Sequence, residues 1–125
     1  MIVSIGIDII EVRRVREVLA RTPRFAERVF TDAERDYCES RGVVAAQHYA
    51  ARFAAKEAAL KALQTGWRGG ISWHDVEVAA YDSGAPYLIL RGIAKELLEA
   101  LGASRAYLSI SHTTEHAIAE VVLER

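Results

Sequence analysis

Residues 52–63, RFAAKEAALKAL, lie in a run without glycine or proline that extends from about residue 44 to residue 64. This run predicts a long helix that ends at Gly66. Its many alanines predict close packing in the middle of the domain. Lys56, Glu57 and Lys61 interrupt this small-sided surface. The charges therefore either face water or converge on a charged ligand.

The segments on either side of this helix predict an α+β fold. Residues 2–9 alternate in the manner of a strand, with Val3, Ile5, Ile7 and Ile9 on one side and small or polar residues on the other. Helical spacing follows up to Pro23, and Thr31 with Glu34 fits a capping box at the start of a further helix. Two hairpins are expected around DSGA (82–85) and TTE (113–115), with a short helix at 93–101 between them.

This order of elements is not a βαβ series, so we expect one compact domain over residues 1–125. It should have a mainly antiparallel sheet of about five strands, packed by the long central helix and shorter helices. Helices on one face of the sheet would leave other apolar surface uncovered, which favours an oligomer.

Composition limits the function classes. The net charge of −1 argues against a general polyanion binder, and we expect neither nucleic acid nor a membrane as partner. The single cysteine, Cys38, cannot form an intrachain disulfide, which fits a cytoplasmic protein. The sequence has no P-loop, no kinase signature and no G-x-S-x-G elbow.

Three places carry candidate chemistry: Asp8 near the end of the first strand, Glu57 with Lys61 one helical turn apart, and His112 at a strand end. Each has a structural alternative, as a helix cap, a surface ion pair and a structural histidine respectively. Ser111 and His112 are not a nucleophile–base pair, because neighbouring strand residues point to opposite faces. Two carboxylates with nearby cations suit Mg²⁺ bound to a diphosphate, with Arg52 and Lys56 adding positive charge.

The motifs GIDIIEVRRV (6–15), RFAERVFTDAE (24–34), RFAAKEAALKALQTG (52–66), DVEV with DSGAPYL (75–78 and 82–88) and YLSISHTTEHAIAEVVLE (107–124) carry a resemblance over essentially the whole chain. The chain resembles the holo-[acyl-carrier-protein] synthases, the small trimeric type of the 4′-phosphopantetheinyl transferase superfamily. One departure is Gln64, where the family commonly has glycine.

The resemblance implies that the 4′-phosphopantetheine arm of coenzyme A is moved to a serine of an acidic acyl carrier protein in fatty acid biosynthesis, releasing adenosine 3′,5′-bisphosphate. By matching position, Asp8 and Glu57 would hold Mg²⁺ and Lys61 would lie beside the diphosphate. His112 would belong to the same site, and the implied coenzyme A contacts are Arg52, Lys61, Gly66, Ser111 and His112. The proton acceptor stays open between Glu57, a metal-bound water and His112.

The resemblance also implies a homotrimer with active sites between subunits. The carrier protein would bind the basic first helix and the turn after it, through Arg14, Val18, Arg21 and Arg24. Without the resemblance, these arginines would be read as a solvated cationic face. The alternative from another class is a non-catalytic trimeric scaffold for carrier proteins. It predicts that Asp8→Ala leaves every function intact.

Overall fold

A computed structural model of the chain describes residues 1–64 and 70–125. The helices and strands in chain order are β1 (Ile2–Glu11), α1 (Val12–Arg21), α2 (Phe25–Val29), α3 (Asp32–Glu39), α4 (Ala45–Leu63), β2 (Val76–Ala80), β3 (Pro86–Leu90), α5 (Gly92–Ala100), β4 (Arg105–His112) and β5 (His116–Glu124). Short 3-10 turns at Gly42–Val44 and Trp73–Asp75 precede α4 and β2.

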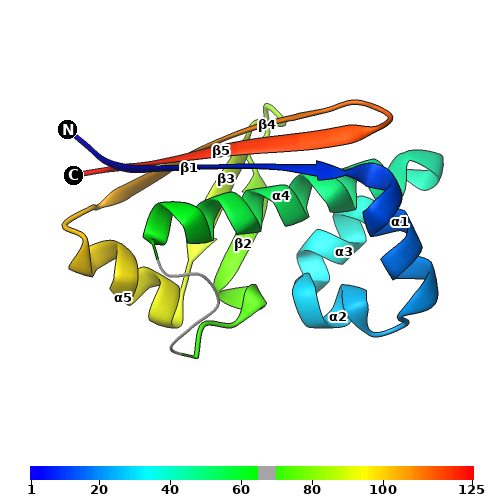
Figure 1. Cartoon of the computed structure of the whole chain (residues 1–125), viewed down its shortest axis with the longest axis horizontal. Coiled ribbons are helices and arrows are strands. Elements are labelled where there is room, and N and C mark those ends of the chain that lie inside the picture. Colours follow the sequence, from blue (N-terminus) through cyan, green and yellow to red (C-terminus); the bar gives the residue numbers. More distant parts are fainter. Residues whose placement is uncertain (65–69) are drawn as a thin grey trace.

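All five strands of the described residues pair antiparallel, as expected, but they form two sheets. One sheet has the order β1-β5-β4 and the other contains β2 and β3. β1 and β5 cross one side of the molecule above α4, with α5 near the chain termini and α1 to α3 at the opposite end (Figure 1). The α+β architecture with a long central helix is therefore confirmed, and the pattern of the sequence did not reveal the division into two sheets.

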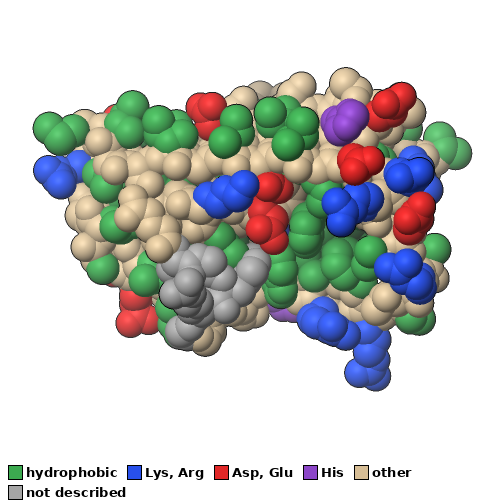
Figure 2. Space-filling model, in the orientation of Figure 1, with side chains coloured by type: hydrophobic (Ala, Val, Ile, Leu, Met, Phe, Trp, Pro, Cys, Tyr) green, Lys and Arg blue, Asp and Glu red, His purple; other side chains and the backbone are tan. Residues whose placement is uncertain are grey.

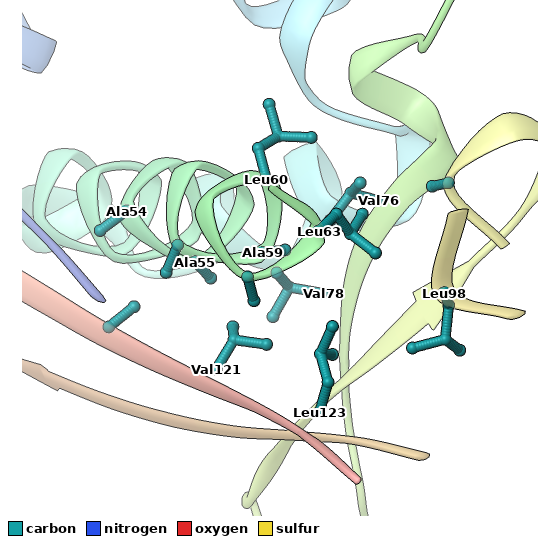
Figure 3. Packing of buried hydrophobic residues seen from close by; sticks show 14 of the residues in the cluster. Ala54, Ala55, Ala59, Leu60, Leu63, Val76, Val78, Leu98, Val121 and Leu123 are labelled. Atoms are coloured by element: carbon teal, nitrogen blue, oxygen red, sulfur yellow. The ribbon is translucent and has the colours of Figure 1, made fainter. Parts of the chain in front are cut away.

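α4 forms the centre of the domain. Of its 19 residues, 12 are buried, and they cover most of its circumference, except for the stripe of Phe53, Glu57 and Lys61. Figure 3 shows Val121 and Leu123 of β5 beneath this helix, near its alanines, and Val78 of β2 beside them. A helix that is buried on most sides requires small residues where backbones come close, which accounts for the alanines.

α4 and β1 come very close to each other at Gly6. A Cβ atom on Gly6 would lie 2.0 Å from the carbonyl oxygen of Ala58 and 2.6 Å from the amide nitrogen of Ala62. On the same side of β1, the Ser4 hydroxyl donates to the carbonyl oxygen of Ala62 at 2.7 Å. The small and polar side of β1 therefore faces the core.

The apolar side of β1 faces outward, together with the same face of β5 and β4. Exposed fractions are 56% for Ile5, 51% for Ile7, 63% for Ile9, 47% for Tyr107 and 37% for Ile118. Glu120, Ser109 and Ser111 lie on the same face, so the exposed apolar side chains are concentrated on β1. A row of exposed isoleucines of this kind commonly marks an interface.

Two local predictions can be checked directly. The capping box is confirmed, because Thr31 Oγ1 accepts from Glu34 N and the Glu34 carboxylate accepts from Thr31 N. Gln64, the C-cap of α4, has φ 64° and ψ 31°, a left-handed conformation that glycine adopts at no steric cost. None of the helices in the described part of the chain is long and apolar enough to cross a membrane.

Candidate active site

Asp8 and Lys61 meet where β1 crosses α4. Asp8 lies two residues after Gly6 on the inner face of β1, and its side chain is 18% exposed. Lys61 Nζ lies 3.1 Å from Asp8 Oδ1 and donates to the carbonyl oxygen of Ile7 at 3.0 Å. The lysine thus holds the carboxylate at a fixed place beside the helix.

Glu57 lies one helical turn before Lys61 and lines the same cleft as Asp8. This cleft has a volume of about 560 Å³, and its wall is formed by Asp8–Glu11 of β1 with Arg14, Val15, Val18, Phe25, Phe53, Glu57 and His116. In Figure 2, acidic side chains lie beside a basic one at the edge of a hydrophobic hollow. The two carboxylates expected from the sequence are therefore close together within one chain.

The donor set of this cleft fits a hard divalent cation. Among the described residues, no group of three or more His, Cys, Asp or Glu side chains gathers in a way that could hold a metal ion. Mg²⁺ needs only one or two protein carboxylates, because waters and substrate phosphates complete its shell. Asp8 and Glu57 would hold it, and the Lys61 ammonium that now contacts Asp8 would be the neighbouring cation.

Lys56 does not belong to this cleft, so the expected contribution of its charge there is wrong. Its side chain is fully buried, Nζ lies 2.9 Å from Glu34 Oε1, and it donates to the carbonyl oxygens of Trp73 and Val76. Burial lowers the pKa of Lys56, and Glu34 counteracts this. Glu34 also accepts from Val78 N at 2.7 Å, so the buried pair joins α3, α4 and β2.

His112 and Arg52 lie on another side of α4. His112 is on β4, two strands from β1, and its Nδ1 lies 3.0 Å from Gln47 Oε1. Arg52 precedes Lys61 by nine residues, so the two side chains leave α4 about 180° apart. We call the group around them the cationic cluster: Tyr37, Arg41, Gln47, His48, Arg52 and His112.

The cationic cluster is held together by rings. The guanidinium of Arg52 lies 3.9 Å from the Tyr37 ring centroid, and the rings of His48 and His112 are 4.9 Å apart. Burial, then the charges of His112, Arg52 and Arg41, lower the pKa of His48 from 6.5 to about 4. His48 is therefore neutral near pH 7, and the positive charge of the cluster rests on Arg41 and Arg52.

The remaining expected site residues are distributed as follows. Arg14 and Val18 line the cleft, whereas Arg21 ends α1 and Arg24 precedes α2, both exposed. Ser111 lies on the outer sheet face, opposite to His112. Gly66 lies outside the described residues.

Sequence reasoning gave no role to three residues that the structure places in the cleft wall: Phe25, Phe53 and His116. Phe53 is one turn before Glu57, so the helical spacing already placed it on that face. Phe25 and His116 come from other elements, and only the tertiary fold brings them there.

Comparison with known proteins agrees with this geometry. Residues 4–120 match the family model of the 4′-phosphopantetheinyl transferase superfamily. A holo-[acyl-carrier-protein] synthase of Koribacter versatilis is 48% identical over 125 residues, which cover 99% of each chain.

Solved structures give the same result. The crystal structure of a holo-(acyl-carrier-protein) synthase from Bacillus anthracis in complex with CoA (3′,5′-ADP) is 42% identical, with a TM-score of 0.82 over 99% of this chain and 97% of that one. The holo-[acyl-carrier-protein] synthase from Neisseria meningitidis is 34% identical, with a TM-score of 0.87 over the full length of both chains.

Proposed function

This chain belongs to the 4′-phosphopantetheinyl transferase superfamily, within it to the holo-[acyl-carrier-protein] synthase enzymes, and we propose that it transfers the 4′-phosphopantetheine arm of coenzyme A to a serine of apo-acyl carrier protein. The observation that carries the proposal is the meeting of Asp8, Glu57 and Lys61 beside a cleft whose other wall is the Arg14–Val18 side of α1. The residues proposed for phosphate chemistry therefore lie next to the surface proposed to bind the carrier protein.

The reaction is a displacement at the phosphorus that bears pantetheine. The serine oxygen forms the new bond, and the bond to the adenosine 3′,5′-bisphosphate side breaks. Mg²⁺, held by Asp8 and Glu57, would supply neutralising positive charge to the diphosphate. Lys61 keeps Asp8 in place, and its ammonium would stabilise the negative charge of the departing phosphate.

Glu57 is the proton acceptor that the geometry favours. It lines the cleft that Arg14 and Val18 also line, where a carrier protein on α1 would present its serine. His112, by contrast, lies on the opposite side of α4, beside Gln47. Glu57→Gln should therefore lower kcat strongly while the KM for the carrier protein changes little.

The acidic carrier protein would bind the basic side of α1. Arg14, Arg21 and Arg24 are exposed and give electrostatic attraction, while the apolar floor around Val18, Phe25 and Phe53 can receive an apolar side chain. Arg14→Glu should raise the KM for the carrier protein, and added salt should weaken binding of the wild type.

We further propose a homotrimer in which neighbouring subunits complete each site. The support is twofold. The outer face of β1 carries the exposed isoleucines Ile5, Ile7 and Ile9. Arg52 and His112 are separated from Lys61 by the thickness of α4. A coenzyme A bound at Asp8 would reach the cationic cluster of a neighbour. Ile7→Glu should then reduce the oligomer to monomers, seen by light scattering, with loss of transfer.

The decisive experiment is mass spectrometry of an apo-carrier protein incubated with coenzyme A, Mg²⁺ and the enzyme. The proposal expects addition of one phosphopantetheine arm, loss of the addition after chelation, and loss in Asp8→Ala with carrier binding retained. Unchanged modification by Asp8→Ala, or none by the wild type with several acidic carriers, contradicts it.

Mixed oligomers test the shared site. Asp8→Ala should be inactive alone, and Arg52→Ala should be nearly inactive at a coenzyme A concentration well below its raised KM. Co-expressed, they should recover about a quarter of wild-type activity, because random assembly pairs two intact halves in about one site in four. If both halves belonged to one subunit, every site would keep one damaged half and the mixture would stay inactive.

A further inference from the structure

Arg52 is buried without a carboxylate partner. The residue is 6% exposed, and within the described part of the chain it forms no ion pair and its Nε has no hydrogen-bond partner. Its guanidinium instead stacks on Tyr37, and Arg41 lies 4.4 Å from the centroid of the same ring. An aromatic face attracts a guanidinium without neutralising its charge.

His112 is held in a similar way. Gln47 Oε1 lies 3.0 Å from Nδ1, and a carboxamide oxygen accepts only, so the hydrogen is on Nδ1 and Nε2 is left for a ligand. The His48 and His112 rings pack in a T-shaped arrangement with centroids 4.9 Å apart, and the Tyr37 and His48 rings do so at 5.5 Å.

The supports of Arg52 and His112 are thus all uncharged. A carboxylate at either position would orient the cation equally well, but it would also cancel the charge and compete with an anionic ligand. No carboxylate of the described residues forms an ion pair with Arg41, Arg52 or His112. The cluster is built to keep its positive charge available to a multiply charged phosphate group.

We propose that Tyr37 and Gln47 are positioning residues of the coenzyme A site: Tyr37 holds the Arg52 guanidinium by its ring face, and Gln47 fixes the tautomer and orientation of His112. The inference rests on the proposed function, because that function assigns Arg52 and His112 to coenzyme A. Neither Tyr37 nor Gln47 needs to contact the ligand.

Paired substitutions test the two roles. Tyr37→Leu should raise the KM for coenzyme A about tenfold, as expected for loss of a desolvated cation–π contact, with the KM for the carrier protein unchanged. Tyr37→Phe keeps the ring face and should stay near wild type. Gln47→Leu should raise the same KM, and ¹⁵N NMR of His112 should show that the Nδ1–H tautomer is no longer fixed. Gln47→Glu should keep that tautomer but weaken coenzyme A binding, because it adds a negative charge beside the anionic ligand.

Arg52→Ala separates failure of the inference from failure of the proposed function. An unchanged KM for coenzyme A in Arg52→Ala removes Arg52 from the site and overturns the proposed assignment itself. A raised KM in Arg52→Ala beside wild-type values in Tyr37→Leu and Gln47→Leu overturns only the positioning roles. If Tyr37→Leu fails to fold, Gln47→Leu at its half-buried position still decides, through both the KM and the NMR signal.

Discussion

Gly6→Ala is the substitution for which the structure predicts the sharpest effect. The added methyl group would lie 2.0 Å from the Ala58 carbonyl oxygen, and carbon atoms at such positions are essentially never closer than 3.0 Å. β1 must therefore retreat from α4 by roughly 1 Å, since both sides of the clash are backbone and no side chain can rotate away. We expect a loss of about 3 kcal/mol in the free energy of unfolding, at the upper end for overpacked cores.

The same displacement reaches the active site. Asp8 follows Gly6 by two residues, so its contact with Lys61, now 3.1 Å, would lengthen. A misplacement of this size can lower kcat/KM by about 100-fold. Urea denaturation measures the first effect and steady-state transfer to a carrier protein measures the second.

A matched pair of variants shows whether the reasoning is right. Ser4→Ala, on the same side of β1, removes the hydrogen bond to Ala62 and an exposed one from Gln64 without a clash, and should cost only about 1–2 kcal/mol. Ala58→Gly should not rescue Gly6→Ala, because the obstacle is the carbonyl group of residue 58 and not its methyl group. Wild-type stability of Gly6→Ala, or rescue by Ala58→Gly, would refute the proposed backbone contact.

Three further predictions concern stability. Lys56→Ala leaves the buried Glu34 carboxylate without its cation and should lower the free energy of unfolding by about 3–5 kcal/mol in urea titrations. The double variant Lys56→Met/Glu34→Gln should recover part of this loss. Unchanged stability of Lys56→Ala would contradict a buried ion pair. Gln64→Gly should raise the free energy of unfolding by up to about 1 kcal/mol, and with it the melting temperature. Glycine adopts the left-handed backbone conformation without strain, and only an exposed hydrogen bond to Ser4 is lost. Because the unfolded chain protonates His48 near pH 6.5 and the folded chain only near pH 4, stability should fall as pH decreases through this window; His48→Phe should flatten that part of the curve, and an identical pH profile would count against the low pKa.

The sequence was sufficient for the order of elements and for the capping box, because these depend on local periodicity and local hydrogen bonds. It did not indicate which side of β1 faces the core. Alternating isoleucines normally mark the buried side of a strand, but here α4 comes so close that only Ser4, Gly6 and Asp8 fit beneath it. The orientation of β1 was decided by the distance between its backbone and that of α4, and the sequence of either segment alone does not give this distance.

The arrangement of the candidate residues could be predicted where they share an element and only in part where several elements meet. Spacing alone placed Glu57 beside Lys61, and the resemblance joined Asp8 to them. The assignment of Lys56 to the charged site was wrong because its partner, Glu34, already had a local role as a capping residue. The supports of the cationic cluster come from α3, α4 and β4, so their association appears only in three dimensions.

The central position of α4 in the core has a consequence for heat inactivation. The helix that carries Arg52, Glu57 and Lys61 is also the one around which the domain is packed, so it cannot melt by itself while the remainder stays folded. On heating, the enzyme should therefore not populate a state that is folded but inactive. Such a state is expected when catalytic residues lie on a loop that can unfold by itself. On a temperature ramp, turnover and near-ultraviolet dichroism should vanish together.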